Sequence, residues 1–217
     1  GIVISTGDVN NYNDGPNNSP STTTAHDLSG ATIGQEALLD PITGGGHTHY
    51  DVTQIDVTFD LLPGYDTIFF HMVFGSEEFP EYVNDSFTDG VGLYVNGSNI
   101  AFVDGGPVNI NHPFMITLPG TELDGILAGS QGPLGPYVHT FSAHLGNGAT
   151  GNTVTFILGD TGDEQYDTTV FLSQLTGGAS QQVNPEPSDP PSIATPEPMT
   201  AMLAVGSMVG LVVRRRR

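Results

Sequence analysis

The feature that most constrains this chain is its lack of basic side chains. The 217 residues include 24 acidic residues and four basic ones, and the basic ones are the last four positions, Arg214, Arg215, Arg216 and Arg217. Residues 1–213 therefore contain no lysine or arginine, so no salt bridge to either can form within this body of the protein. A net charge of −20 repels phosphates and anionic headgroups. We therefore expect no nucleic-acid partner and an attraction for divalent cations.

Apolar runs bounded by Gly, Pro, Asn and Asp recur along the chain, which is typical of strands joined by turns. The expected strands are Gly1–Ser5, Gln54–Leu61, Thr67–Gly75, Val91–Val95, Ile100–Val103, Phe114–Leu118, Val138–Leu145, Thr153–Gly159 and Thr169–Leu175. Asn96-Gly97 predicts a tight hairpin, and only Gly34–Leu39 and Thr121–Ala128 favour short helical turns. The pattern predicts an all-β domain over residues 1–176, a two-sheet antiparallel β-sandwich of the jelly-roll kind with long loops.

Two acidic segments each follow an apolar run that ends in glycine. Phe74–Gly90 reads FGSEEFPEYVNDSFTDG, and Gly159–Asp167 reads GDTGDEQYD. If the strand ends meet, carboxylates gather at one edge of the sandwich, where they repel or retain protons unless a cation binds. Ca²⁺ prefers oxygen ligands of this type. The predicted calcium ligands are Glu77, Glu78, Asp89, Asp160, Asp163 and Asp167. Glu81 and Asp85 are expected to be solvated neighbours, and a wholly solvated pair of loops is the alternative.

Other chemistries are weakly indicated. His47-Thr48-His49 would place two imidazoles on one face of a strand and could bind zinc, but the sequence shows no third ligand. The chain has no cysteine and no G-x-S-x-G motif, so nucleophilic catalysis is not indicated. A pair of carboxylates would suffice for glycoside hydrolysis, yet their abundance singles out no pair. We predict a protein that is not an enzyme.

The C-terminal part of the chain has a different composition. Residues 177–195 are rich in Pro and Ser and read as a linker. Met199–Val213 is an uncharged apolar run that predicts a short hydrophobic, transmembrane helix with the four arginines on its cytoplasmic side. At about 1.5 Å per residue, the run needs its flanks to cross a core of about 30 Å. The chain starts at Gly1 inside an apolar run, so we expect a missing upstream part.

Pro196-Glu197-Pro198, the apolar run and the terminal arginines, taken together over residues 196–217, resemble a PEP-CTERM sorting signal. That resemblance implies an exosortase as partner in a Gram-negative-type bacterium. It implies export and transient anchoring in the inner membrane, followed by placement at the cell surface or outside the cell.

A second resemblance covers the body of the chain. GIVISTGD at the start, the block Phe74–Asp89 and the block Asp160–Leu172 are similar, in this order, to the choice-of-anchor L family. Thr88-Asp89 stands where that family tends to have Asn-Asp. The resemblance implies an extracellular, β-rich surface domain without established enzymatic activity, and it favours a metal site shared by the two blocks. We expect a calcium-stabilised surface or extracellular-matrix protein that contacts polysaccharide or another matrix component. The alternatives are a calcium-dependent carbohydrate-binding module and a secreted polysaccharide hydrolase.

Overall fold

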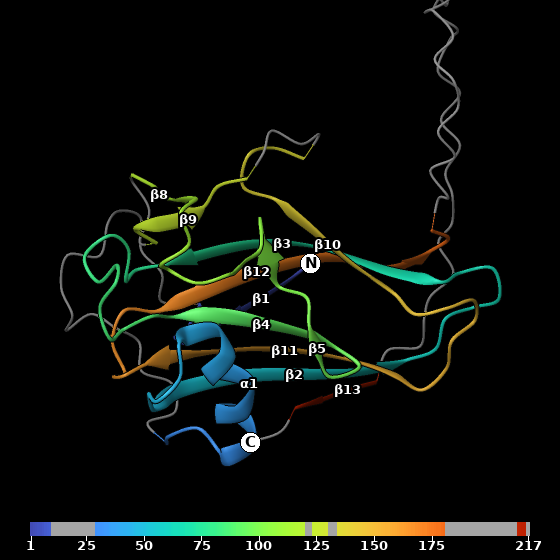
Figure 1. Cartoon of the computed structure of the whole chain (residues 1–217), viewed down its shortest axis with the longest axis horizontal. Coiled ribbons are helices and arrows are strands. Elements are labelled where there is room, and N and C mark those ends of the chain that lie inside the picture. The colour runs from blue at the N-terminus through green and yellow to red at the C-terminus, as the bar shows by residue number, and fades with distance from the viewer. Residues whose placement is uncertain (10–28, 120–122, 130–133, 181–211, 216–217) are drawn as a thin grey trace, which may run out of the picture.

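Two antiparallel sheets pack face to face, with apolar side chains of their strands buried between them. The computed structural model describes residues 1–9, 29–119, 123–129, 134–180 and 212–215. In Figure 1 the strands of both sheets run across the picture, with one sheet, sheet A, above the other, sheet B. The predicted two-sheet antiparallel sandwich is therefore confirmed.

Sheet A has the order β1-β12-β3-β9-β8, and β10 also pairs with β3. Its strands are β1 (Ile2–Ser5), β3 (Thr67–Ser76), β8 (Met115–Thr117), β9 (Gly125–Leu127), β10 (His139–His144) and β12 (Thr168–Gly178). Sheet B has the order β13-β2-β11-β4-β5. Its strands are β2 (His49–Phe59), β4 (Gly90–Val95), β5 (Ser98–Asn99), β11 (Asn152–Thr161) and β13 (Val212–Arg215). A small separate ribbon is formed by β6 (Phe102–Val103) and β7 (Gly106–Pro107).

The core lies between the two sheets. Phe70 on β3 and Phe156 on β11 meet edge to face, with ring centroids 5.9 Å apart. The hairpin predicted at Asn96-Gly97 joins β4 to β5, and both residues have positive φ (48° and 81°), as a two-residue turn of this kind requires.

Helix α1 (Ile33–Thr43) packs on the outer face of sheet B. Leu39 and Ile42 form a second apolar cluster with Tyr94 and Ile157. The helix comes close because β4 has a glycine where it passes: a Cβ on Gly92 would lie 2.8 Å from Ile42 Cδ1. The predicted helical turn at 34–39 is thus the start of a longer, fully formed helix.

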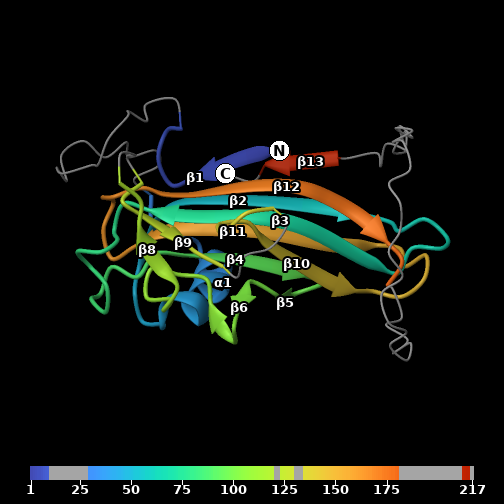
Figure 2. The ribbon, with the colours of Figure 1, turned by 90° about the horizontal axis from the view of Figure 1, so that it is seen from above.

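The two ends of the sandwich carry different loops. Figures 1 and 2 show the loops 77–89 and 162–167 together at the left-hand end, and the loops 60–66 and 145–151 at the right-hand end. The former group contains both acidic segments, so we call that end, with its loops, the acidic end.

The structure corrects two helix predictions. Gly125–Leu127 forms β9 instead of part of a helical turn, because its backbone pairs with both β3 and β8 and its side chains are buried. Val212 and Val213 lie in β13, which pairs with the edge of β2, instead of ending a helix. The rest of the sorting-signal prediction, residues 196–211 with Arg216 and Arg217, lies outside the described residues. Within the parts of the chain that the structure describes, no helix has both the length and the apolar character needed to span a membrane.

Candidate functional site

The acidic end is assembled by two loops that both cross between the sheets. The first acidic segment leads from the end of β3 in sheet A to the start of β4 in sheet B. The second leads from the end of β11 in sheet B to the start of β12 in sheet A. Ser76 pairs with Thr168, and Gly159 pairs with Gly90, so the strands that carry the two segments are antiparallel neighbours in each sheet. The segments therefore meet at one end, as the prediction required.

Hydrogen bonds fasten the two segments to each other. The Glu77 N–H donates to the Asp167 carbonyl oxygen over 3.1 Å. Asp89 accepts from the Thr161 N–H at 2.7 Å and from the Thr168 hydroxyl at 2.8 Å. One side chain of the first segment thus bonds to both strands that flank the second.

Aromatic packing and one glycine add to this connection. Tyr82 and Tyr166, one from each segment, lie with ring centroids 5.4 Å apart. Gly162 has φ 91°, and a Cβ there would lie 3.1 Å from the Ser86 carbonyl oxygen, so glycine permits the close approach of the two loops.

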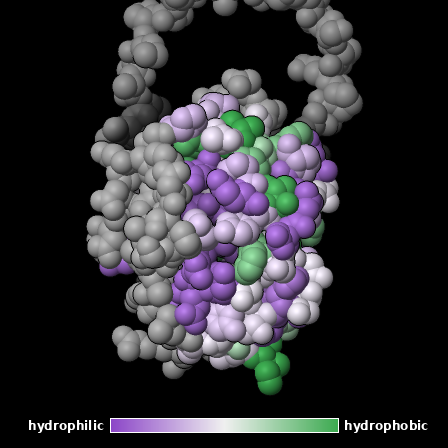
Figure 3. Space-filling view, turned by 90° about the vertical axis from the view of Figure 1, so that its left-hand side faces the viewer, coloured by the Kyte–Doolittle hydropathy of each residue, from purple (hydrophilic) through white to green (hydrophobic). Residues whose placement is uncertain are grey.

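Most of the predicted ligands are removed from solvent. The buried ones, each at most 2% exposed, are Glu77, Glu78, Asp89, Asp160 and Asp167. Asp163 is half-buried, while Glu81 and Asp85 are exposed, as expected of solvated neighbours. Figure 3 looks onto this end and shows a largely hydrophilic surface over the coloured residues. Carboxylates are almost never fully buried unless they are paired, so this burial distinguishes the group from an ordinary acidic loop.

Two of the buried carboxylates have oxygen atoms that are unsatisfied among the residues that the structure describes. Glu78 Oε2 and both carboxylate oxygens of Asp160 are inaccessible to solvent and accept no hydrogen bond of normal geometry. Burial, followed by the charge of Asp89, raises the pKa of Glu78 to about 10. The same two causes raise the pKa of Asp160 well above its ordinary value, although the nearby Thr6 hydroxyl opposes the shift. Such groups hold a proton or need a cation.

Asp89 and Asp163 are shifted in the same direction. Burial raises the pKa of Asp89 to about 8, against the opposing effect of the hydrogen bonds from Thr161 and Thr168. Burial also raises the pKa of Asp163, whose carboxylate accepts from the Gln165 N–H at 3.0 Å. The acidic end therefore resists ionisation at several positions at once.

The sequence reading missed Asp51, which is 1% exposed and adds to the negative potential at Asp160. Asp51 lies in β2, and the residue before it, Tyr50, pairs with Asp160 of β11. The expected strand began at Gln54, so Asp51 fell outside it. Only the pairing of β2 with β11 places Asp51 here, and no local sequence signal gives that pairing.

The histidine pair departs from its prediction. β2 begins at His49, so His47 precedes the strand and the two residues do not lie together on one strand. His49 is fully buried against α1. Among the described side chains, Glu36, Asp40 and His49 are the group whose ligand atoms all lie within 4.8 Å of one another. Metal binding at the acidic end, by contrast, requires its carboxylates to draw closer around an ion.

Comparison with known proteins gives one match. A family model described as "Choice-of-anchor L domain" matches residues 1–114, which include the first acidic segment. The second segment lies beyond the matched residues, although its strands complete the same two sheets. No curated protein and no solved structure gives a significant match to the chain.

Proposed function

The chain belongs to the choice-of-anchor L domain family, which indicates a surface-associated protein, and from this we propose that it is an exported, non-enzymatic surface or matrix protein stabilised by calcium at its acidic end. The proposal assigns Glu77, Glu78, Asp89, Asp160, Asp163 and Asp167 as the residues that surround the ion. Asp51 joins them because it faces the same buried charges.

The observation that carries the proposal is the burial of Glu78 Oε2 and of both Asp160 carboxylate oxygens without a hydrogen bond of normal geometry among the described residues. A buried carboxylate without a partner costs free energy in the folded state, and residues 1–213 contain no lysine or arginine to offset it. A divalent cation would neutralise two such groups at once. It would also tie the ends of four strands from both sheets together.

Calcium fits this donor set better than other cations. Among the described residues, the side chains assigned to this end offer carboxylates and no thiolate or imidazole, which suits a hard cation. Magnesium demands nearly ideal octahedral geometry and keeps its waters, whereas calcium accepts about six to eight oxygens in irregular arrangements. Carboxylates delivered from separate strand ends match the second requirement.

The C-terminal residues support the location. The order of Pro196-Glu197-Pro198, the apolar run and the terminal arginines fits processing by an exosortase at the inner membrane, followed by release or attachment outside the cell. Deletion of residues 199–217 should move the protein from the membrane fraction to the soluble exported fraction. An unchanged distribution would remove this part of the proposal and leave the calcium site untouched.

The test of the calcium site is the melting temperature of the full chain with chelator and with Ca²⁺. At a free Ca²⁺ concentration of about 100 times Kd, the folded state gains about 2.7 kcal/mol. For a chain of this size that corresponds to roughly 5–10 °C. Titration calorimetry should show heat of binding over the same range.

Matched variants decide whether that gain comes from the acidic end. Asp160→Asn keeps the shape of a buried side chain and removes its charge, so the calcium-dependent shift should disappear. Asp85→Asn changes an exposed carboxylate of the same loops and should keep the full shift. A wild-type protein with no shift and no heat of binding would disprove the proposal.

A further inference from the structure

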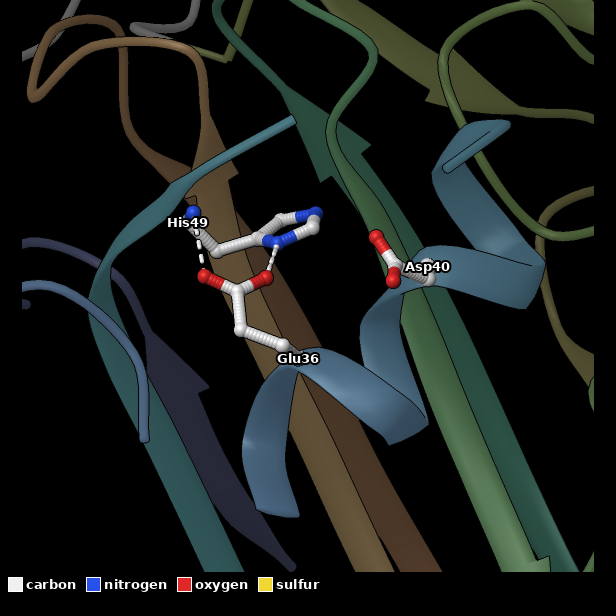
Figure 4. A group of neighbouring side chains, drawn as sticks. All are labelled: Glu36, Asp40 and His49. Carbon is white, nitrogen blue, oxygen red and sulfur yellow. Dashed lines mark hydrogen bonds and ion pairs between the residues drawn. The ribbon is translucent and has the colours of Figure 1, made fainter. Parts of the chain in front are cut away.

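A second group of ligand-type side chains lies on the other face of sheet B, away from the core. It combines Glu36 and Asp40 of α1 with His49, the first residue of β2. Figure 4 shows both carboxylates on the side of α1 that faces His49, with Asp40 turned toward the imidazole. None of these residues belongs to the acidic segments.

The backbone around this group is fixed from both sides. A capping box at the start of α1 pairs Thr32 with Gln35 and sets the first turn, one residue before Glu36. Glu36 and Asp40 then follow one turn apart on the same face of the helix. The His49 N–H donates to Glu36 Oε1 at 3.1 Å, and the Ala31 N–H donates to the His49 carbonyl oxygen at 2.7 Å. The start of β2 is thus held against the start of the helix.

The imidazole of His49 is oriented through both of its nitrogens. Nδ1 lies 2.5 Å from Glu36 Oε2, and Nε2 lies 3.0 Å from the Thr43 hydroxyl. Thr43 Oγ1 also lies 3.4 Å from the Leu39 carbonyl oxygen, to which it donates. Its oxygen therefore accepts from an Nε2–H, and Nδ1 is the nitrogen left to share a proton or a metal with Glu36. A partner that fixes the second nitrogen is the usual arrangement for a metal-binding histidine.

The Asp40 side chain, unlike those of Glu36 and Thr43, makes no hydrogen bond that orients His49 among the described residues. Its Oδ1 is inaccessible to solvent and has no hydrogen-bond partner among the described residues. One of its carboxylate oxygens lies within 4.8 Å of ligand atoms of both Glu36 and His49. A hydrogen-bonded His–Glu pair would be complete by itself. The Asp40 carboxylate, a third potential ligand beside that pair with one buried oxygen unsatisfied, needs a different explanation.

We propose that Glu36, Asp40 and His49 form a second metal site, for a transition-metal dication of the zinc type. One imidazole nitrogen and two carboxylate oxygens are a ligand set that such ions prefer and that calcium does not. The ion replaces the proton between Nδ1 and Glu36 Oε2 and takes Asp40 as its third ligand. It joins the N-terminal turns of α1 to the start of β2, and a fourth position stays open. This site is independent of the proposed calcium site.

Of the three ligands of this site, the sequence indicated only His49. The H-x-H pattern suggested zinc but offered His47 as the second ligand and no third one. In the fold the further ligands, Glu36 and Asp40, come from the helix, where the sequence predicted only a short helical turn over Gly34–Leu39.

The test is zinc binding by the metal-free full chain in excess Ca²⁺, measured by competition with a chromophoric chelator. The wild-type chain should bind one equivalent of Zn²⁺. Asp40→Asn should weaken binding at least about tenfold, since even residues that only orient a metal ligand change affinity by about 10–100-fold. His49→Gln should abolish it.

Asp40→Asn is informative because the unpartnered carboxylate can be changed without breaking the Glu36–His49–Thr43 hydrogen bonds, so the variant should fold. Asp104→Asn, an exposed carboxylate in a turn, is its matched control and should bind like the wild type. His47→Gln tests the other reading of the H-x-H pattern and should also bind like the wild type. Equal zinc affinity in the wild type and Asp40→Asn, or no zinc binding in excess Ca²⁺, would overturn the proposal.

Discussion

The two ends of the sandwich shift the pKa of a carboxyl group in opposite directions. Asp66, just before β3, accepts hydrogen bonds from the Ser180 N–H, the Ser180 hydroxyl and the Thr67 hydroxyl, at 2.5, 2.6 and 2.8 Å. These donors, with those of Ser180 first, lower the pKa of Asp66 to about 2. At the opposite end of β3, burial raises the pKa of Glu78 to about 10.

The difference shows two ways in which carboxylates are accommodated in residues 1–213, which contain no lysine or arginine. At the Asp66 end, backbone and hydroxyl donors satisfy the charge near solvent, and the carboxylate stays ionised. At the acidic end, the carboxyl groups are buried, and Glu78 Oε2 and both Asp160 oxygens accept no hydrogen bond of normal geometry among the described residues. At the Asp66 end the hydrogen-bond donors of the protein are enough to stabilise the ionised carboxylate. At the acidic end the buried carboxyl groups need either protons or a bound cation to be stabilised, which is why we assign function to that end.

The largest effect expected from this contrast is on the pH dependence of stability without metal. In the folded state Glu78 keeps its proton from its ordinary value of 4.5 up to about 10, and Asp89 keeps its proton from 3.8 up to about 8. The folded state then binds more protons than the unfolded state, so stability falls as pH rises. Each such group contributes at most about 1.4 kcal/mol per pH unit.

Chelated protein should therefore lose about 1 kcal/mol or more per pH unit between pH 5 and 8, measured by urea unfolding. Saturating Ca²⁺ should flatten or reverse that slope, because the ion favours the ionised carboxylates. A metal-free protein whose stability rises over this range would contradict the assignment of protonated acids to this end.

The next effect concerns single substitutions in chelator. Glu78→Gln should raise the free energy of unfolding at pH 8 by about 1 kcal/mol or more, because the neutral amide folds without the proton uptake that Glu78 needs at a pH far above its ordinary pKa. The same variant should respond less to Ca²⁺ than the wild type. Glu81→Gln, an exposed neighbour, should stay within about 0.5 kcal/mol of the wild type. A loss of stability in Glu78→Gln would mean that the carboxylate has a partner that the variant breaks.

The sandwich was predictable because its signals are local. Alternation and turn residues mark β3, β4 and β11 within a few positions of their ends, and Asn96-Gly97 identifies its hairpin without further context. β9 was missed because only three residues form it and one of its two partner strands, β3 with Gly75 and Ser76, lies far away in sequence. Tertiary pairing there overrides a weak local preference.

The candidate sites, too, were predictable only where their signals are local in sequence. The acidic segments are visible in sequence because each concentrates its carboxylates, whereas Asp51 reaches them through strand register. The His49 group needs a helix and a strand from different parts of the fold, and residue spacing cannot bring them together. Local composition therefore identified the type of site but not its full membership.

The smallest effect on stability is expected at the Asp66 end, and there stability falls as the pH falls, opposite to the acidic end. A pKa below the ordinary value means that the ionised Asp66 contributes stability above pH 3.8, which is lost as the pH falls through about 2. Asp66→Asn should therefore lower the melting temperature at pH 7, and the difference from the wild type should vanish near pH 2. Ca²⁺ should not change that difference, because Asp66 lies at the far end of β3 from the acidic segments. If Asp66→Asn removed the calcium response, the two ends would be coupled, and the separation drawn between a satisfied carboxylate and a ligand-binding one would fail.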